Sequence, residues 1–132
     1  MKLASNIHVI RGKEGFDRAK VEKNAIVVLT LVIVGRECQM VWIAVEGDTY
    51  EARHLMKKLG LRWDRAYKAW VFSDYTSKKG LDKYDGDDRK MLETLWRDKL
   101  FEWISMSFKV ANEVALEFPR KKIYYSLEVK LP

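Results

Sequence analysis

The sequence has little of what builds disulfide-bonded, zinc-binding or membrane-spanning proteins. Cys38 is its only cysteine, which excludes an internal disulfide and a zinc site built on cysteines. Its two histidines, His8 and His54, lie far apart without the spacing of a metal site. The longest apolar run, residues 25–34, is well short of the roughly 20 residues that span a bilayer. It therefore predicts a strand, buried on both faces and central in a sheet.

Targeting signals and linkers are also scarce. The first residues carry one lysine and no apolar stretch after it, so we expect no secretory signal and a cytoplasmic location. Gln39 is the only glutamine, whereas lysine, arginine and glutamate are plentiful, a balance typical of thermophile proteins. There is no repeat and no Pro/Gly/Ser-rich linker. With 132 residues, the length suits one hydrophobic core, so we expect residues 1–132 to form a single domain.

The apolar periodicity predicts strands and helices of one α+β domain. Strands are expected over residues 25–34, 39–45, 61–64, 69–73 and 123–131, after a short strand-like segment at 6–10. Residues 16–23 fit either a short helix or a charged strand. A short helix is expected over 50–59, and a long amphipathic helix, or two with a break near Ser105 or Ser107, over 87–118. We expect a small, mostly antiparallel sheet packed against one short and one long helix, in the order ββ-α-ββ-α-β.

The expected helix ends have sequence signals. Asp48 or Thr49 is a candidate N-cap of the short helix, and Gly60 is placed to end it in a left-handed conformation. Its apolar face is expected to contain Ala52, Leu55, Met56 and Leu59. The acidic cluster of Asp82, Asp85, Asp87 and Asp88 suits the amino terminus of the long helix, which Pro119 would end.

Positive charge is concentrated in one segment. Of the formal net charge of +6, residues 51–80 contribute +5, from eight Lys and Arg residues against three acidic residues. A local surplus of this kind favours a polyanionic partner.

The same segment carries a family resemblance. Residues 55–72 read LMKKLGLRWDRAYKAWVF and resemble a helix–hairpin module of the pattern K-x-L-G-x-[RK]-[WF]-D-x-x-x-K-x-W. That module occurs beside primases, topoisomerases and mobilisation proteins of plasmids. The segment is also similar to the core of the HARP domain of annealing helicases, where K-x-W-x-F is followed by Asp-Tyr, here Asp74 and Tyr75. The resemblance covers about residues 50–75 and implies the company of DNA-processing proteins. It implies no activity, because no helicase, primase or topoisomerase motif occurs elsewhere.

These observations favour a small nucleic-acid-binding accessory protein of a thermophile plasmid or virus, with DNA as the expected partner. The helix–hairpin submodule, about residues 49–75, would contact phosphates through its cations and stack bases on Trp63 or Tyr67. The cations are Arg53, Lys57, Lys58, Arg62, Arg65 and Lys68. Two alternatives stay open: Trp63 and Trp70 are core residues of the hairpin, and the basic face is only solvated.

Other functional constellations are weaker. Residues 82–93 lack the ligands of an EF-hand loop, and no phosphate-binding glycine loop occurs. Glu128 and Lys130 have the E-x-K form of metal-dependent nucleases, but the upstream carboxylates Glu113 and Glu117 fall on a helix. We therefore expect neither enzymatic activity nor a cofactor, and no membrane partner. The aromatic residues of the long helix suggest a homodimer as an alternative function; they are Trp96, Phe101, Trp103, Phe108 and Phe118.

Overall fold

The computed structural model describes residues 2–11, 22–35, 38–77 and 86–131, with side chains at all of these except 76, 77 and 86–96. Six strands form one sheet in the order β1-β6-β2-β3-β5-β4. Their bounds are β1 Ile7–Val9, β2 Ile26–Val34, β3 Cys38–Gly47, β4 Arg62–Asp64, β5 Ala69–Ser77 and β6 Ile123–Lys130. The helical elements are the 3₁₀ turn η2 (Tyr50–Ala52), the short helix α1 (Arg53–Lys58) and the long helix α2 (Gly86–Glu117).

The sheet is mixed. β2, β3, β5 and β4 pair antiparallel through two hairpins, but β6 runs parallel to both β2 and β1. The predicted α+β class is confirmed, and the predicted order needs the short strand β1 before it. The expectation of an antiparallel sheet holds for β2, β3, β5 and β4, but not for β6 and β1. Local patterns cannot tell which strand β6 will join, because parallel partners are brought together by a long connection.

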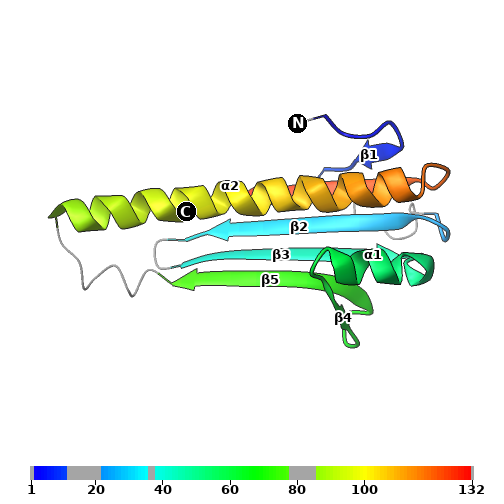
Figure 1. Cartoon of the computed structure of the whole chain (residues 1–132), viewed down its shortest axis with the longest axis horizontal. Coiled ribbons are helices and arrows are strands. Elements are labelled where there is room, and N and C mark those ends of the chain that lie inside the picture. The colour runs from blue at the N-terminus through cyan, green and yellow to red at the C-terminus, as the bar shows by residue number, and fades with distance from the viewer. Residues whose placement is uncertain (1, 12–21, 36–37, 78–85, 132) are drawn as a thin grey trace.

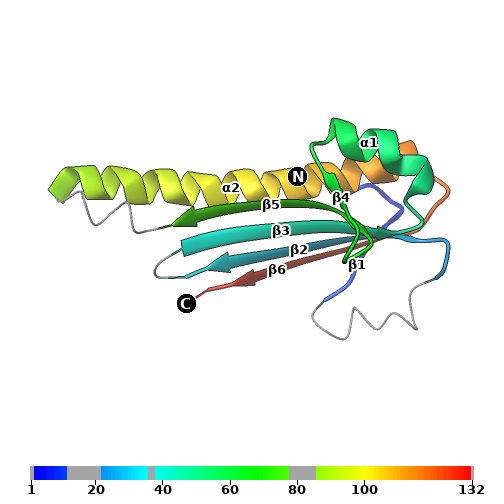
Figure 2. The ribbon, with the colours of Figure 1, turned by 90° about the horizontal axis from the view of Figure 1, so that it is seen from below.

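Both helices lie on the same face of the sheet (Figures 1 and 2). α2 runs along the strands, while α1 lies at one end of the sheet, in front of β3 and β5 in Figure 1. No described helix covers the opposite face, which we call the open face.

The burial of β2 follows this one-sided arrangement. Ile26, Val28 and Val32 point toward the helices and are completely buried, whereas Leu29 and Leu31 on the open face are only partly buried. The strand is central, as predicted, but full burial on both faces is wrong. The reason is that helices cover only one side in the described part of the chain.

α2 is one continuous helix, so the predicted alternative of a break near Ser105 or Ser107 is wrong. Ser107 is completely buried, and its hydroxyl is shared between the hydroxyls of Thr30 on β2 and Tyr125 on β6, the latter 2.8 Å away. A serine hydroxyl used in this way does not compete for the helix backbone. Burial raises the pKa of the Tyr125 phenol, against a lowering by the Ser107 hydrogen bond, so the group stays protonated.

The carboxyl end of α2 is capped from a distant segment. The Asn6 amide nitrogen donates to the carbonyl oxygens of Ala115, Phe118 and Lys121, at 3.0, 3.1 and 3.2 Å. The Ala115 carbonyl lies in the last turn of α2, where carbonyls have no partner within the helix, and the other two belong to the turn that follows it. Pro119 follows the helix as predicted. At the amino end, Asp87 and Asp88 lie in the first turn, whereas Asp82, Asp85 and most of the ambiguous segment 16–23 lie outside the described residues.

Replacing Ser107 tests how much the buried hydroxyls contribute. We expect Ser107→Ala to lower the free energy of unfolding by about 1–3 kcal/mol, because Thr30 and Tyr125 would lose a buried partner. The measurement is urea unfolding followed by circular dichroism. Ser105→Ala, an exposed serine on the same helix, is the matched control, with an expected change within about 0.5 kcal/mol. Equal effects of both substitutions would contradict a role for the buried network.

Candidate nucleic-acid interface

The predicted short helix exists, with a tighter first turn. It begins as the 3₁₀ turn η2 and continues as α1 to Lys58. Ala52 and Met56 are buried and Leu55 and Leu59 partly buried, which confirms the predicted apolar face. Thr49 occupies the N-cap position, one of the two predicted, but its side chain makes no capping hydrogen bond. The Asp48 carboxylate instead pairs with Lys121 at 2.9 Å.

Gly60 ends this helix as predicted. Its φ is +87°, the left-handed region that glycine adopts without steric cost, and a Cβ there would meet no atom within 4 Å. Glycine is therefore favoured at position 60 by its backbone conformation and not by a lack of space for a side chain. The turn directs the chain from α1 back into β4.

β4 and β5 form the predicted hairpin at the edge of the sheet. The indole rings of Trp63 and Trp70 pack edge to face with centroids 5.6 Å apart. Trp70 is a core residue at 8% exposure, whereas Trp63 is 48% exposed. An Asp64 carboxylate oxygen accepts from the backbone N–H groups of Ala66 and Tyr67, at 2.9 and 3.0 Å, which fixes the turn. The interpretation of Trp70 as core is confirmed, and Trp63 keeps a free aromatic surface.

Asp74 anchors the hairpin to α2. Its carboxylate accepts a hydrogen bond from the Trp103 indole N–H at 3.0 Å and pairs with Lys99 at 3.2 Å. Desolvation alone would raise the pKa of Asp74. The hydrogen bonds from Trp103, Lys99 and the Tyr75 backbone outweigh it and hold the pKa below its ordinary value. Asp74, the first residue of the Asp-Tyr pair that follows the K-x-W-x-F segment, therefore makes structural contacts.

The eight predicted binding residues lie where α1, β4 and the turn before β5 meet, which we call the corner. Within it they lie on different sides of the sheet. Trp63 faces the helices with Trp70, and the strand register places Arg62 on the open face opposite Val71. Lys57 and Lys58 are exposed on the last turn of α1, while Arg65 and Lys68 are exposed in the turn after β4. Tyr67 lies over the open face, with its ring 5.4 Å from that of Trp42. A ligand would have to cross the edge strand β4 to touch all of them.

Arg53 differs from the other predicted cations. Its guanidinium donates to the Tyr50 carbonyl oxygen at 2.8 Å and lies 4.2 Å from the centre of the Tyr50 ring. These contacts hold its side chain against η2. The remaining cations are better placed for a ligand.

Cations without a described ion-pair partner are concentrated in this corner, although Lys2, Arg97 and Arg120 elsewhere on the surface also form no such pair. Lys121 and Lys122 have carboxylate partners at 2.9 and 2.8 Å, and Lys99 pairs with Asp74. By contrast, five exposed cations of the corner form no ion pair with any described residue: Lys57, Lys58, Arg62, Arg65 and Lys68. Exposed cations without neutralising partners produce the positive potential that attracts a polyanion.

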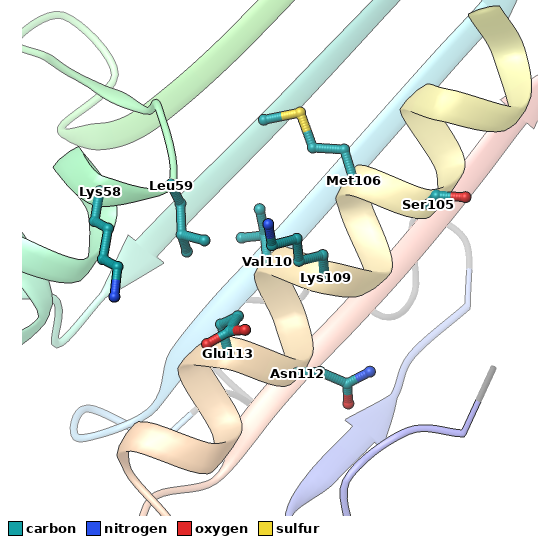
Figure 3. Close-up of a pocket in the computed structure, with 8 residues that line it drawn as sticks. All are labelled: Lys58, Leu59, Ser105, Met106, Lys109, Val110, Asn112 and Glu113. Atoms are coloured by element: carbon teal, nitrogen blue, oxygen red, sulfur yellow. The ribbon is translucent and has the colours of Figure 1, made fainter.

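A groove between α1 and α2 extends the corner. It has a volume of about 630 Å³; Lys58 and Leu59 contribute from α1, and Met106, Lys109 and Glu113 from α2 (Figure 3). Lys109 is a cation that the sequence analysis missed. No local pattern connects it with Lys58, because only the packing of the helices on one sheet face brings the two together.

A second groove lies beside Tyr67 on the open face, which we call the Tyr67 groove. It has a volume of about 720 Å³ and contains Ala66, Tyr67 and Lys68 on the side of the hairpin turn. Glu22 and Lys23 line it from the segment before β2, and Val27 and Leu29 contribute apolar surface from β2 itself. Lys23 too is a residue that the sequence analysis did not select.

The other predicted constellations are not assembled. On β6, the Lys130 Nζ lies 4.0 Å from the Glu128 Oε1. The strand register places Leu31, rather than a carboxylate, opposite Glu128. Among residues 2–11, 22–35, 38–77 and 86–131, no group of three His, Cys, Asp or Glu could hold a metal ion. Of the predicted dimer aromatics on α2, Trp103 is buried, Phe101 is 69% exposed, and the Trp96 side chain lies outside the described residues.

Comparisons with known proteins give no match. No protein-family model fits the sequence, no curated protein is significantly similar to it, and no solved structure matches its fold. The function must therefore be argued from the residues themselves. In the described part of the chain, no helix is long and apolar enough to cross a membrane.

The low pKa of Asp74 predicts a pH-dependent difference in stability. A carboxyl whose pKa is lowered on folding stabilises the fold above its unfolded pKa, and that contribution is lost as the pH falls through the folded pKa. We expect Asp74→Asn to lower the free energy of unfolding by roughly 1 kcal/mol at pH 7. The difference from the unmodified protein should shrink below about pH 4.

The measurement is urea unfolding at pH 7, 4 and 3. Asp98→Asn, at an exposed position of α2, is the control and should show no such pH dependence. If the effect of Asp74→Asn is the same at all three pH values, the proposed charge interaction is wrong.

Proposed function

We propose that this protein binds nucleic acid through the corner formed by α1, β4 and the turn before β5. The observation that carries the proposal is the set of five exposed cations without described ion-pair partners, beside the exposed rings of Trp63 and Tyr67. Cations neutralise phosphates and release counterions, while aromatic rings stack on bases, so the combination suits a nucleic acid. The family resemblance of residues 50–75 supports DNA as the partner and an accessory role in a plasmid or virus.

Binding should depend on salt and on the corner cations. We expect fluorescence anisotropy of labelled DNA to show affinity that falls steeply between low and moderate salt. The combined variant Lys57→Ala, Lys58→Ala and Arg62→Ala should weaken binding by about tenfold or more and flatten the salt dependence, because three phosphate contacts are removed.

A charge-matched control separates the corner from the net charge. The variant Lys2→Ala, Arg120→Ala and Lys130→Ala removes the same charge from exposed positions outside the corner, and it should bind nearly as well as the unmodified protein. Equal losses in both variants would mean that only overall charge matters. Absence of binding at low salt would refute the proposed function.

A second candidate, a homodimeric interaction protein, is favoured by two exposed apolar side chains on α2. Phe101 and Leu116 are 69% and 70% exposed, and large apolar side chains in water favour association. If this function is correct, we expect a dimer in sedimentation equilibrium at micromolar concentration. The double variant Phe101→Asp and Leu116→Asp should be a monomer under the same conditions. A monomer across the whole concentration range would exclude it.

A further inference from the structure

Tyr67 is held in an unusual position for a large exposed side chain. The turn that follows β4 carries it across the sheet edge onto the open face, where its ring meets Trp42 at an interplanar angle of 65°. The backbone N–H of Tyr67 donates a hydrogen bond of 3.0 Å to the Asp64 carboxylate, which holds the turn in place. Even so, 66% of the residue is exposed. The ring is thus positioned by the protein while most of its surface remains available for contact.

The next residue, Lys68, occupies a costly backbone conformation. Its φ is +51°, the only positive φ of a non-glycine residue in the described part of the chain. The left-handed region costs a side-chain-bearing residue about 1–2 kcal/mol, and glycine would fit there without that cost. Lysine at this position puts a long cationic side chain on the rim of the Tyr67 groove.

The rest of the groove complements the two chemical parts of a nucleotide. Val27 and Leu29 offer apolar surface to the flat face of a base, beside the aromatic ring of Tyr67. Lys23 and Lys68 offer positive charge to phosphate. Two carboxylates also line the groove. Glu22 pairs with Lys122 at 2.8 Å, and Glu46 on β3 is likewise engaged in an interaction of its own.

We propose that the Tyr67 groove receives an unpaired base of a single-stranded nucleic acid, which stacks on Tyr67 while Lys23 and Lys68 contact the adjoining phosphates. This inference rests on the proposed function and adds the class of ligand. A base within a duplex is paired and stacked on its neighbours, so its face cannot contact Tyr67 unless it is extruded.

The positions of the candidate contact residues on both faces of the sheet also favour a single strand. Arg62 and Tyr67 lie on the open face, whereas Trp63 faces the helices, so the candidate contacts lie on both sides of the edge strand β4. A duplex is stiff over about 150 base pairs and cannot bend around an edge that is one strand wide without a large cost. A single strand bends freely, so one strand can pass over β4 and touch both sides.

The test compares single-stranded and double-stranded DNA of the same sequence by anisotropy, using the full chain. Single-stranded DNA should bind more tightly, and Tyr67→Leu should weaken that binding between about fivefold and about 150-fold while leaving duplex binding within about twofold. Tyr75→Leu is the matched control, since Tyr75 is 63% exposed and lies outside the groove; it should bind like the unmodified protein.

Lys68→Gly separates binding from folding. Glycine relieves the left-handed backbone, so the variant should unfold at an equal or higher urea concentration while it binds single-stranded DNA more weakly. Weaker binding accompanied by lower stability would count against a role of the side chain in contacting the ligand.

The possible failures are distinguishable. Equal affinity for both DNA forms, together with unchanged binding by Tyr67→Leu, would overturn the groove assignment but leave the basic corner in place. Equal losses in Tyr67→Leu and Tyr75→Leu would also overturn it. No binding of any DNA at low salt would refute the proposed function and this inference together.

Discussion

The parallel pairing of β2 with β6 is the constraint on which the rest of the structure depends. Parallel neighbours cannot be joined by a tight turn, so the chain must travel back along the sheet before β6 begins. α2 makes this return. Its 32 residues span about 48 Å, against about 30 Å for the nine residues of β2. The helix is longer than the strands and extends past the sheet at its amino end (Figure 1).

Two polar contacts in the middle of α2 fix its position on the sheet. Ser107 joins β2 and β6 at the centre through the hydroxyls of Thr30 and Tyr125. Trp103, one turn earlier, donates to Asp74 on β5. Because β5 continues the β4–β5 hairpin, the second contact also sets the position of the candidate interface. A helix that shifted along the sheet would break both contacts at once.

Local elements of this fold could be predicted from the sequence, whereas their faces and neighbours could not. The β-branched run of β2, the glycine at position 60 and the alternation around Trp63 each encode structure within a few residues. The partner of β6 and the proximity of Lys58 to Lys109 depend on contacts between residues far apart in the chain. Asp48 does not cap the short helix for the same reason, since its carboxylate pairs with Lys121 from the segment before β6. Strand alternation already implies that Arg62 and Trp63 lie on opposite faces. That a ligand must cross β4 to touch both follows only once β4 is known to be the edge strand.

Edge protection is the main rival explanation for cations at β4. Exposed edge strands attract other strands, and charged side chains on a short edge prevent such pairing. β4 has only three residues, with Arg62 and Asp64 on its open side, so it fits that description. Edge protection, however, needs only charge along the strand. It accounts neither for the exposed rings of Trp63 and Tyr67 nor for a lysine in a left-handed conformation, since large apolar rings beside an edge would promote association. The combination of these rings with cations lacking described ion-pair partners therefore supports the proposed ligand, which has both flat faces and negative charge.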